Sequence, residues 1–458
     1  MKNNSSGFSR KLSDRRSVVK GGIAAGGIGL FGGRTGAFAQ DATPGASPVA
    51  SPVGSPVASP VSGAPAVAPA SVIAERASGD VRLTGFGNPL EQENVRTVLE
   101  AFSAKYPNIN VSYEPVAAEY LVTIQANIAA GNVADIFMVQ NEYAQDFMSR
   151  NVLLPIDDFM AEDGITKDMF YQPLIEAYTW QDQLYGLPKD WSPLGAVYDP
   201  DAFQSAGVTM PTTWDELRTA LQTLKDATGA PALALAPVFD RFVMFLFQAG
   251  GSVTNADVTA TALDSPEATA ALEFYYGLYR DGLSATPADI GAGWPGDAFV
   301  QGLTPLVFEG NWMFPTLRSD APDKPFEVAE LPAGPGGKGT PAFTNSYSIF
   351  QGSQNPEAAW VLVNYLTGVD GARGALPLGL ALPALPALED EFLELFPERA
   401  AYLEAGRYAT ALQYGPGGQA FATDANAALD LLFAGTLDVA GAQAALVEAA
   451  NSNITFNS

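Results

Sequence analysis

Residues 81–139 alternate between short apolar runs and amphipathic segments, and this alternation limits the possible folds more than any other part of the chain. Two amphipathic segments, one opening at Pro89 and one ending at Gly131, have the end signals of helices. The apolar runs around them are rich in residues that favour strands, namely Val81–Phe86, Ile109–Tyr113 and Ala134–Val139. A β-α-β-α-β order of this kind predicts an α/β fold with a doubly wound, mainly parallel sheet.

Polar side chains follow the first and the third of these predicted strands. In a doubly wound sheet, ligands bind at the carboxyl ends of the strands. The residues at these two ends are Asn88, Asn141, Glu142 and Tyr143. We therefore expect these side chains to face a ligand, although Tyr143 is equally compatible with an ordinary loop aromatic.

Composition narrows the class of protein. The chain has 458 residues, which is more than one hydrophobic core usually supports and favours two lobes. Its 24 Lys and Arg residues against 50 Asp and Glu residues give a formal charge of −26, so no nucleic-acid partner is expected. Because the chain has neither Cys nor His, it cannot form thiolate nucleophiles, imidazole-based triads or Cys/His zinc sites. Neither a metal nor a cofactor is expected.

The first 39 residues have the features of an export signal. Arg15 and Arg16 form a twin-arginine pair, Gly21–Gly33 is a weakly apolar run, and a small-x-small cleavage site ends at Ala39. We therefore expect export by the twin-arginine route to an extracellular or periplasmic location, associated with the cell envelope. A lipid anchor on an N-terminal Cys is not expected, since the chain lacks Cys.

Residues 40–78 are dominated by Pro, Ser, Ala and Gly, and Ser-Pro-Val recurs at Ser47, Ser51, Ser55 and Ser59. Proline at this density interrupts helices and sheet ladders, so the segment is predicted to be a disordered, extended spacer. The folded part of the chain is expected to start near Asp80.

Three segments in order carry motifs that resemble a known family. Gln183–Pro188 reads Gln-Leu-Tyr-Gly-Leu-Pro, Gly195–Phe203 contains Tyr-Asp-Pro-Asp-Ala-Phe, and Ala206–Leu217 contains Pro-Thr-Thr-Trp-Asp-Glu-Leu. In the last motif, Thr213 and Glu216 are spaced as a helix capping box. The order resembles the family 1 extracellular solute-binding proteins, the receptors of bacterial ABC importers, most often for sugars. Similar segments extend the resemblance over roughly residues 80–455, namely Ala129–Phe137, Gly296–Val300, Val307–Met313, Leu331–Gly337 and Asn355–Trp360.

The resemblance implies a two-lobe, periplasmic-binding-protein-like α/β fold of type II, with a hinge that the chain crosses more than once. The expected crossings, each with a proline beside an apolar run, lie near Pro188–Lys189, Pro341 and Leu382–Pro383. The domains would then be residues 79–188 plus 342–382 for lobe one, and residues 189–341 plus 383–458 for lobe two.

A sugar site needs a flat aromatic ring and charged or amide groups that pair with hydroxyls. Asp190 and Trp191 follow the first expected crossing, and Trp294 lies in a loop of Gly and Pro that offers it no obvious core. Asp190 is the strongest candidate, because an acid beside a tryptophan at a hinge is hard to explain as packing. The remaining candidates near predicted strand ends or crossings are Glu309, Asn311, Trp312, Asn345, Ser346, Tyr347 and Arg373. For Trp312, core packing remains an alternative.

The resemblance implies a monomeric receptor that binds a sugar or oligosaccharide between its lobes and delivers it to the permease subunits of an ABC importer. A receptor for a non-sugar solute, such as a polyamine or a peptide, remains an alternative. A secreted glycosidase would need two facing carboxylates, for which Glu142 and Asp190 are available. No hydrolase motif accompanies them, so no enzyme activity and no catalytic residue is expected.

Overall fold

The computed structural model describes residues 71–457. The predicted export signal, with Arg15, Arg16 and Ala39, and the part of the predicted spacer up to residue 70 lie outside the described residues.

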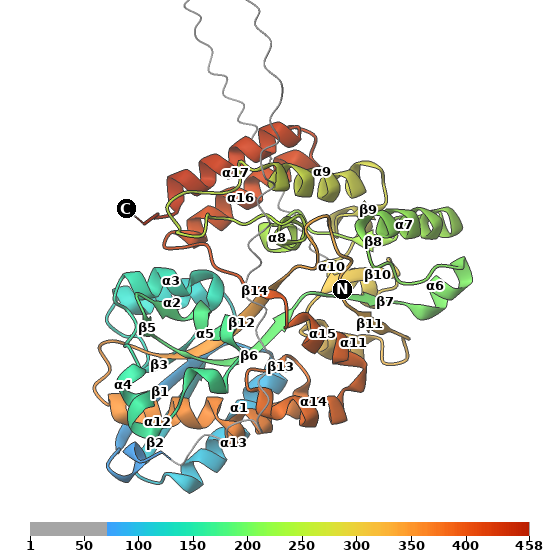
Figure 1. Cartoon of the computed structure of the whole chain (residues 1–458). Coiled ribbons are helices and arrows are strands. Elements are labelled where there is room, and N and C mark those ends of the chain that lie inside the picture. Colours follow the sequence, from blue (N-terminus) through green and yellow to red (C-terminus); the bar gives the residue numbers. More distant parts are fainter. Residues whose placement is uncertain (1–70, 458) are drawn as a thin grey trace, which may run out of the picture. The chain divides into compact units, whose positions relative to one another are not determined.

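The three predicted N-terminal strands pair in parallel with one another within a seven-stranded sheet (Figure 1). They are β1 (Gly79–Gly85), β2 (Ile109–Pro115) and β3 (Ile136–Gln140). Later strands complete the sheet in the order β13-β6-β12-β3-β1-β2. They are β6 (Leu187–Pro193), β12 (Thr340–Ile349), β13 (Leu382–Pro383) and β14 (Ala409–Ala411), of which β14 pairs with β12. Because β12 runs antiparallel to both β3 and β6, the sheet as a whole is mixed rather than mainly parallel.

Helices cover both faces of this first sheet (Figure 1). They are α1 (Pro89–Lys105), α2 (Tyr120–Ala129), α3 (Asn141–Ser149), α4 (Asp157–Asp163), α5 (Gln172–Ala177), α12 (Pro356–Thr367), α13 (Val369–Ala375) and α14 (Glu389–Leu395), with a short hairpin of β4 (Thr179–Trp180) and β5 (Gln183–Leu184). Helix α15 (Ala400–Ala405) contacts β6 of this sheet and also strands of the second sheet. The helices α1, α12 and α13 pack against one another, and their core includes the fully buried Phe102 and Trp360. Asn88 opens α1 as a capping box with Glu91, which fixes where the helix begins after β1.

A second, five-stranded sheet has the order β11-β7-β10-β8-β9. Its strands are β7 (Gly195–Tyr198), β8 (Leu233–Ala234), β9 (Ser284–Ala285), β10 (Leu306–Glu309) and β11 (Glu327–Ala329). The helices around it are α6 (Pro200–Ala206), α7 (Trp214–Thr228), α8 (Phe239–Gln248), α9 (Pro266–Arg280), α10 (Pro295–Val300), α11 (Met313–Asp320), α16 (Gly418–Phe433) and α17 (Val439–Asn453). A mixed α/β fold with two sheets and two cores is therefore confirmed.

Helix α7 ends and begins where the sequence predicts. The Thr213 side chain accepts a hydrogen bond from the Glu216 amide, and Gly229 ends the helix in the left-handed conformation at φ 73°. Leu217 and Leu221 on its inner face are fully buried in the second core.

The chain passes between the two sheets more than once. It leaves the first sheet with β6, enters the second at β7 after Leu194, and returns between β11 and β12. Asn141 at the start of α3 ties two returning segments together. Its Nδ2 donates to the carbonyls of Ala342 and Leu412, each at 2.9 Å, and its Oδ1 accepts from the Thr344 amide at 3.0 Å. The position of a hinge and the lobe boundaries given above stay predictions.

The predicted spacer extends too far along the chain, because its last residues pack on the folded domain. Ile73 lies in a short 3-10 helix (Ile73–Glu75) and is fully buried. The amides of Val72 and Ile73 donate to Asp163 at 2.8 and 3.1 Å, and Arg76 pairs with Glu162. The buried side chain of Ile73 and the buried carboxylate of Asp163 thus hold residues 72–76 against α4.

Across residues 71–457, none of the helices has both the length and the apolar character that a membrane span requires.

Candidate functional site

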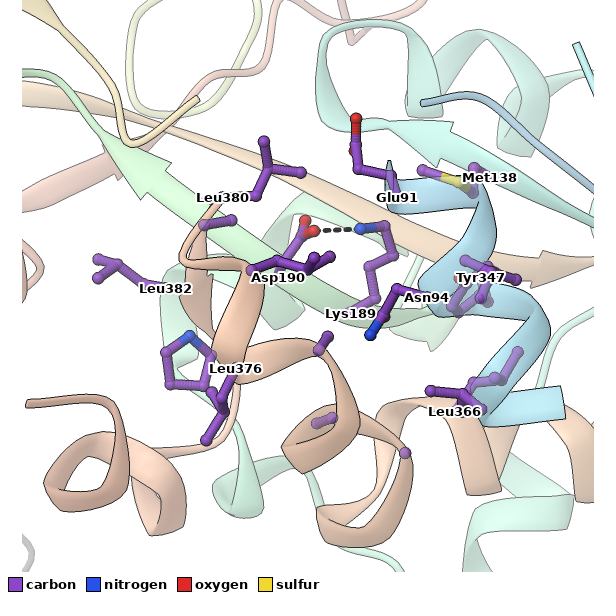
Figure 2. A pocket seen from close by; sticks show the side chains of 18 of the residues that line it. Glu91, Asn94, Met138, Lys189, Asp190, Tyr347, Leu366, Leu376, Leu380 and Leu382 are labelled. Atoms are coloured by element: carbon purple, nitrogen blue, oxygen red, sulfur yellow. Dashed lines mark hydrogen bonds and ion pairs between the residues drawn. The ribbon is translucent and has the colours of Figure 1, made fainter. Parts of the chain in front are cut away.

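A β-bulge places two opposite charges at one point of the first sheet. Asp190 pairs with Asn345, and Pro188 pairs with Ser346, so Lys189 has no partner on β12. An extra residue of this kind re-aims the side chains around it. Lys189 and Asp190 are neighbours in the chain, yet their side chains form an ion pair and line the same cavity (Figure 2).

The cavity beside this ion pair has a volume of about 90 Å³ and lies between the sheet, α1, α13 and residues 376–383. Its polar groups come from Glu91, Asn94, Lys189, Asp190 and Tyr347. The rest of the wall is mostly apolar, with Phe86, Val95, Val98, Met138, Leu366, Ala372, Leu376, Leu378, Leu380 and Leu382 (Figure 2). The structure therefore combines a charged edge with an apolar interior.

The charged edge of the cavity has more acidic than basic side chains. Burial lowers the pKa of Lys189 more than any single neighbour raises it, but the charge of Asp190, the neighbouring Tyr347, the hydrogen bond to Asp190 and the charge of Glu91 together raise it above its ordinary value, so the ammonium group stays protonated. Burial raises the pKa of Glu91, while a hydrogen bond from the Asn88 amide and the charge of Lys189 oppose this shift. Because two acidic side chains, Glu91 and Asp190, lie beside the single ammonium group of Lys189, the edge disfavours an anionic ligand.

Strand β12 runs from the cavity to a second polar cluster, with Tyr347 at the cavity and Phe343 at the cluster. Side chains two residues apart on a strand share a face, so Phe343, Asn345 and Tyr347 lie on one side of β12. The Nδ2 of Asn345 donates to Asp190 at 3.3 Å, while the Oδ1 of Asn345 is buried without a partner. Tyr347 lines the cavity, and burial raises the pKa of its hydroxyl to about 12.

The second cluster surrounds Arg241 at the start of α8. The buried Glu309 accepts hydrogen bonds from Arg241 at 3.0 and 3.1 Å and from the indole N–H of Trp312 at 2.8 Å. The guanidinium carbon of Arg241 lies 5.5 Å from the centre of the Trp312 ring and 5.7 Å from that of Phe343. Trp312 and Phe343 meet edge to face, with ring centres 5.3 Å apart. Two aromatic rings are thus held beside an ion pair, a combination of flat faces and charged groups that suits a polar ring. The Trp312 ring also folds over Gly310, where a Cβ atom would lie 2.3 Å from it, so core packing stays an alternative for Trp312.

Glu142 brings a carboxylate from the first lobe close to charges of the second. Its pKa is raised to about 8, first by burial and then by the charge of Asp240 in α8, with Arg241 opposing the shift. Asp240 itself accepts a hydrogen bond from the Tyr414 hydroxyl at 2.5 Å. The Oε2 of Glu142 is buried and has no hydrogen-bond partner.

Four of the buried polar atoms without a hydrogen-bond partner belong to predicted site residues, while others lie elsewhere in the described chain, for example on Ser284, Thr304 and Arg399. The four are Oε2 of Glu142, the hydroxyl of Tyr143, Oδ1 of Asn311 and Oδ1 of Asn345. The Asn311 side chain also donates to Ser192 of β6 at 3.3 Å, so it links β6 with the segment after β10. Buried polar atoms in folded proteins nearly always have partners, and unpaired ones therefore mark places where a ligand or water fits.

The other predicted site residues lie outside the cavity, or their polar atoms already have partners within the protein. Asn88 is exposed and caps α1, and the amide group of Asn141 is engaged by backbone, as described above. Ser346 is fully buried and its hydroxyl contacts Ser348 at 2.9 Å. Arg373 is exposed, pairs with Glu391 and does not line the cavity.

Two further predicted site residues, Trp191 and Trp294, lie outside the cluster around Arg241 and pack within the protein. Trp191 is 2% exposed, and its indole N–H donates to the carbonyl of Pro383 at 3.1 Å. Trp294 is half-buried against the first core, so the sequence argument that no core surrounds it is wrong. The reason is local, because its ring folds back over Gly296, where even a Cβ atom would lie 2.2 Å from it. Their role in ligand binding stays a prediction.

Several residues of the site were missed from the sequence, namely Glu91, Lys189, Asp240, Arg241, Phe343 and Tyr414. A usable signal existed for the pair Asp240–Arg241, which interrupts an otherwise apolar run from Phe239 to Phe247. Two adjacent charges at the start of such a helix need a partner or a ligand. For Phe343 and Tyr414, the sequence offers no comparable signal. In the described part of the chain, no group of acidic side chains is arranged to hold a metal ion.

Comparisons with known proteins agree with this architecture. The family model described as bacterial extracellular solute-binding protein matches residues 88–373. A Brucella abortus protein named only as a binding protein is 28% identical over 286 residues, 59% of this chain and 67% of the relative. The maltotriose-binding protein of Pyrococcus abyssi is 24% identical over 301 residues, 64% of each chain.

Two solved structures illustrate the likeness in fold. An ABC substrate-binding protein of Listeria monocytogenes, in complex with cycloalternan, has a TM-score of 0.75 and 22% identity, over 82% of this chain and 98% of that one. The GacH receptor of Streptomyces glaucescens, solved unliganded and with acarbose, has a TM-score of 0.74 and 21% identity, over the same shares.

Proposed function

Because the chain belongs to the family of bacterial extracellular solute-binding proteins, we propose that it is the substrate-binding receptor of an ABC importer. Its ligand is a sugar or an oligosaccharide, bound between the two lobes and delivered to the permease subunits in the membrane. The relatives named for maltotriose, cycloalternan and acarbose support this ligand class. The receptor acts as an exported monomer and makes or breaks no bond in its ligand.

The observation that carries the sugar assignment is the set of buried, unpaired oxygen atoms beside aromatic rings. Asn311 and Asn345 each present one such oxygen that can accept a hydrogen bond from a sugar hydroxyl, and Glu142, whose pKa of about 8 keeps it protonated at neutral pH, presents a carboxyl group that can donate or accept one. Trp312, which follows Asn311 in the chain, and Phe343, on the same side of β12 as Asn345, supply flat apolar faces. A neutral, hydroxyl-rich ring satisfies both kinds of group at once, which a wholly apolar ligand does not.

The side chains of the candidate site come from both sheets, and a ligand that binds them is therefore expected to close the two lobes. Glu142 and Asp190 belong to the first sheet and its helices, whereas Arg241 and Trp312 belong to the second. A ligand that contacts side chains of both sheets binds the closed state more tightly than the open state. This difference in affinity shifts the protein toward the closed state. We place the moving points at Leu194, between β11 and β12, and after β14, where the chain changes from one sheet or core to the other. These points replace the crossings expected near Pro188–Lys189, Pro341 and Leu382–Pro383, because those residues lie within strands β6, β12 and β13 of the first sheet.

A cationic solute such as a polyamine is the second candidate. Glu91, Glu142, Asp190 and Asp240 are four acidic residues in and around the candidate site, and the chain as a whole carries a formal charge of −26. Ammonium groups would pair with such carboxylates directly. The sugar remains the better fit, because Lys189 and Arg241 already pair with Asp190 and Glu309.

A thermal-shift screen of the mature chain distinguishes the two candidates. Probes are mono- and oligosaccharides, including maltotriose, and the polyamines putrescine and spermidine. A ligand present at 100 times its Kd adds about 2.7 kcal/mol to the free energy of unfolding, which gives a clear rise in melting temperature. Stabilisation by a sugar that is recovered chemically unchanged supports the proposal, and stabilisation by polyamines alone replaces it with the second candidate.

A further inference from the structure

We propose that the cavity beside Lys189 and Asp190 receives a small apolar substituent of the bound sugar, and that the preferred ligands are therefore 6-deoxy sugars. This inference rests on the proposed sugar-binding function and adds a ligand class to it. Four features support it: the size of the cavity, its lining, its charged edge and the way its walls are fixed.

The size of the cavity allows a substituent but not a whole ring. Its volume is about 90 Å³. A protein cavity of about 150 Å³ is known to hold one benzene ring. A pyranose ring with its hydroxyls is larger than benzene, so the ring must stay outside, near Asp190, Asn345 and the Arg241 cluster. What enters the cavity is a branch of a few heavy atoms.

The lining decides the chemistry of that branch. Leu366, Leu376, Leu378 and Leu380 form much of the wall opposite the sheet, with Val95 on α1 beside them. A hydroxyl group placed among such side chains loses its hydrogen bonds to water without replacement. A methyl group at the same position gains from leaving water. The cavity therefore favours a sugar with CH₃ where ordinary hexoses carry CH₂OH.

The edge of the cavity supplies the polar contacts that a sugar ring needs. Asp190 accepts hydrogen bonds from ring hydroxyls, and Lys189 donates them, since both side chains reach the cavity. Asn345 lies next to Asp190 with an unpaired buried oxygen. The acidic pair Glu91 and Asp190 repels carboxylate-bearing sugars such as uronic acids. The ligand is thus neutral, with hydroxyls on its ring and an apolar branch.

Hydrogen bonds hold the walls in place, so the cavity does not depend on a ligand to form. Asn94 of α1 donates to the carbonyl of Gly374 at 2.8 Å, which joins α1 to α13. On the far side, Arg318 donates to the carbonyl of Leu378 at 3.3 Å, and Arg399 donates to that of Gly379. Sites for small molecules are usually pre-formed in this way.

The test is a calorimetric titration of the mature chain with matched pairs of sugars. The pairs are 6-deoxy-D-glucose against D-glucose, L-fucose against L-galactose, and L-rhamnose against L-mannose, free and as the terminal units of disaccharides. We expect the 6-deoxy member of at least one pair to bind about tenfold tighter or more, the factor that corresponds to one unpaired hydroxyl. Equal or weaker binding of all 6-deoxy members overturns the inference, while binding of the parent sugars leaves the proposed function standing. If no sugar of either kind binds, the proposed function fails as well.

Substitutions in the cavity test whether it causes the preference for 6-deoxy sugars. Ala372 lines the cavity and is buried, so Ala372→Leu fills it and should bring the affinities of the two members of a pair within about twofold. Ala104→Leu, on an exposed part of α1, is the matched control and should keep the preference. Leu380→Ala enlarges the cavity and should improve the binding of a 6-O-methyl sugar relative to the parent chain. If Ala372→Leu keeps the full preference, or if Leu380→Ala leaves 6-O-methyl sugars unaffected, the cavity is not the determinant.

Discussion

The side chain of Asn345 donates a hydrogen bond to the carboxylate of Asp190, 3.3 Å away, at the point where β6 carries one residue more than β12. That extra residue is Lys189, whose ammonium group pairs with the same carboxylate. Asp190 is therefore fixed by two donors from neighbouring positions. A carboxylate held in this way presents its remaining lone pairs in one direction and needs no rearrangement to bind a ligand.

Asp190→Ala should weaken the binding of the cognate sugar by roughly ten- to hundredfold. The reason is the loss of a charge-assisted hydrogen bond worth about 1.5–3 kcal/mol, at 1.4 kcal/mol per decade in Kd. Calorimetric titration measures the change. Asp190→Asn keeps the shape and the position of one oxygen, so its loss of affinity should be smaller. Unchanged binding by both variants would remove Asp190 from the site.

Trp312→Ala should reduce sugar affinity by about tenfold or more, because it removes the flat ring that Arg241 and Phe343 hold in place. Trp360→Phe is the matched comparison. Trp360 is fully buried in the first core and its indole N–H donates to Asp163 at 2.6 Å, so its replacement should lower the melting temperature of the unliganded protein with affinity nearly unchanged. If Trp360→Phe weakens binding while Trp312→Ala does not, the proposed site is contradicted.

Local signals in the sequence predicted much of the fold. The three N-terminal strands and the helices α1 and α7 have apolar periodicity and capping residues that act within a few positions, such as Thr213 with Glu216. The second core and the mixed character of the first sheet depend on strands brought together from distant parts of the chain. Strand β12, for example, pairs with β3 and β6, from which it is separated by well over a hundred residues. No local pattern specifies such pairings.

The sequence prediction selected residues whose chemistry was unusual in its local context and missed residues whose partner was distant in the chain. Asp190 stood out beside a tryptophan, and the structure places it at the cavity. Trp294 stood out in the same way, yet its ring packs against the core. The acid–base pair of Arg241 and Glu309 lies between residues far apart in the chain, and its existence depends on the fold of the second lobe.

Ile73→Ala should lower the free energy of unfolding by about 2–5 kcal/mol, as for other buried aliphatic residues. Ile73 is fully buried although it lies in a segment predicted to be a spacer. Val72→Ala is the control, because Val72 is 48% exposed and its replacement should change stability by less than about 0.5 kcal/mol. Urea denaturation of both variants measures the difference. Equal effects would mean that residues 71–78 do not pack on the domain in solution.

Glu142 should make stability depend on pH between about 4.5, its ordinary pKa, and about 8, its pKa in the folded protein. In this range the folded protein retains a proton that the unfolded chain has released. The free energy of unfolding from this group is therefore highest below pH 4.5 and falls as the pH rises through the window, by at most about 1.4 kcal/mol per pH unit. The side chain of Glu142→Gln does not titrate. The difference in the free energy of unfolding between the parent chain and this variant, followed against pH, therefore isolates the contribution of Glu142.

Asp240→Asn separates the two causes of that shift. Burial of Glu142 is unchanged in this variant, but the neighbouring negative charge is absent, so the pKa of Glu142 should fall and the pH window should narrow from its upper end. Denaturation curves at pH 5, 6, 7 and 8 for the parent chain and both variants provide the test. A parent chain whose stability relative to Glu142→Gln does not fall between pH 5 and 8 would show that Glu142 is not held beside Asp240 in the unliganded protein. If the fall persists unchanged in Asp240→Asn, burial alone raises the pKa, and the approach of the two lobes at this point is not electrostatically opposed.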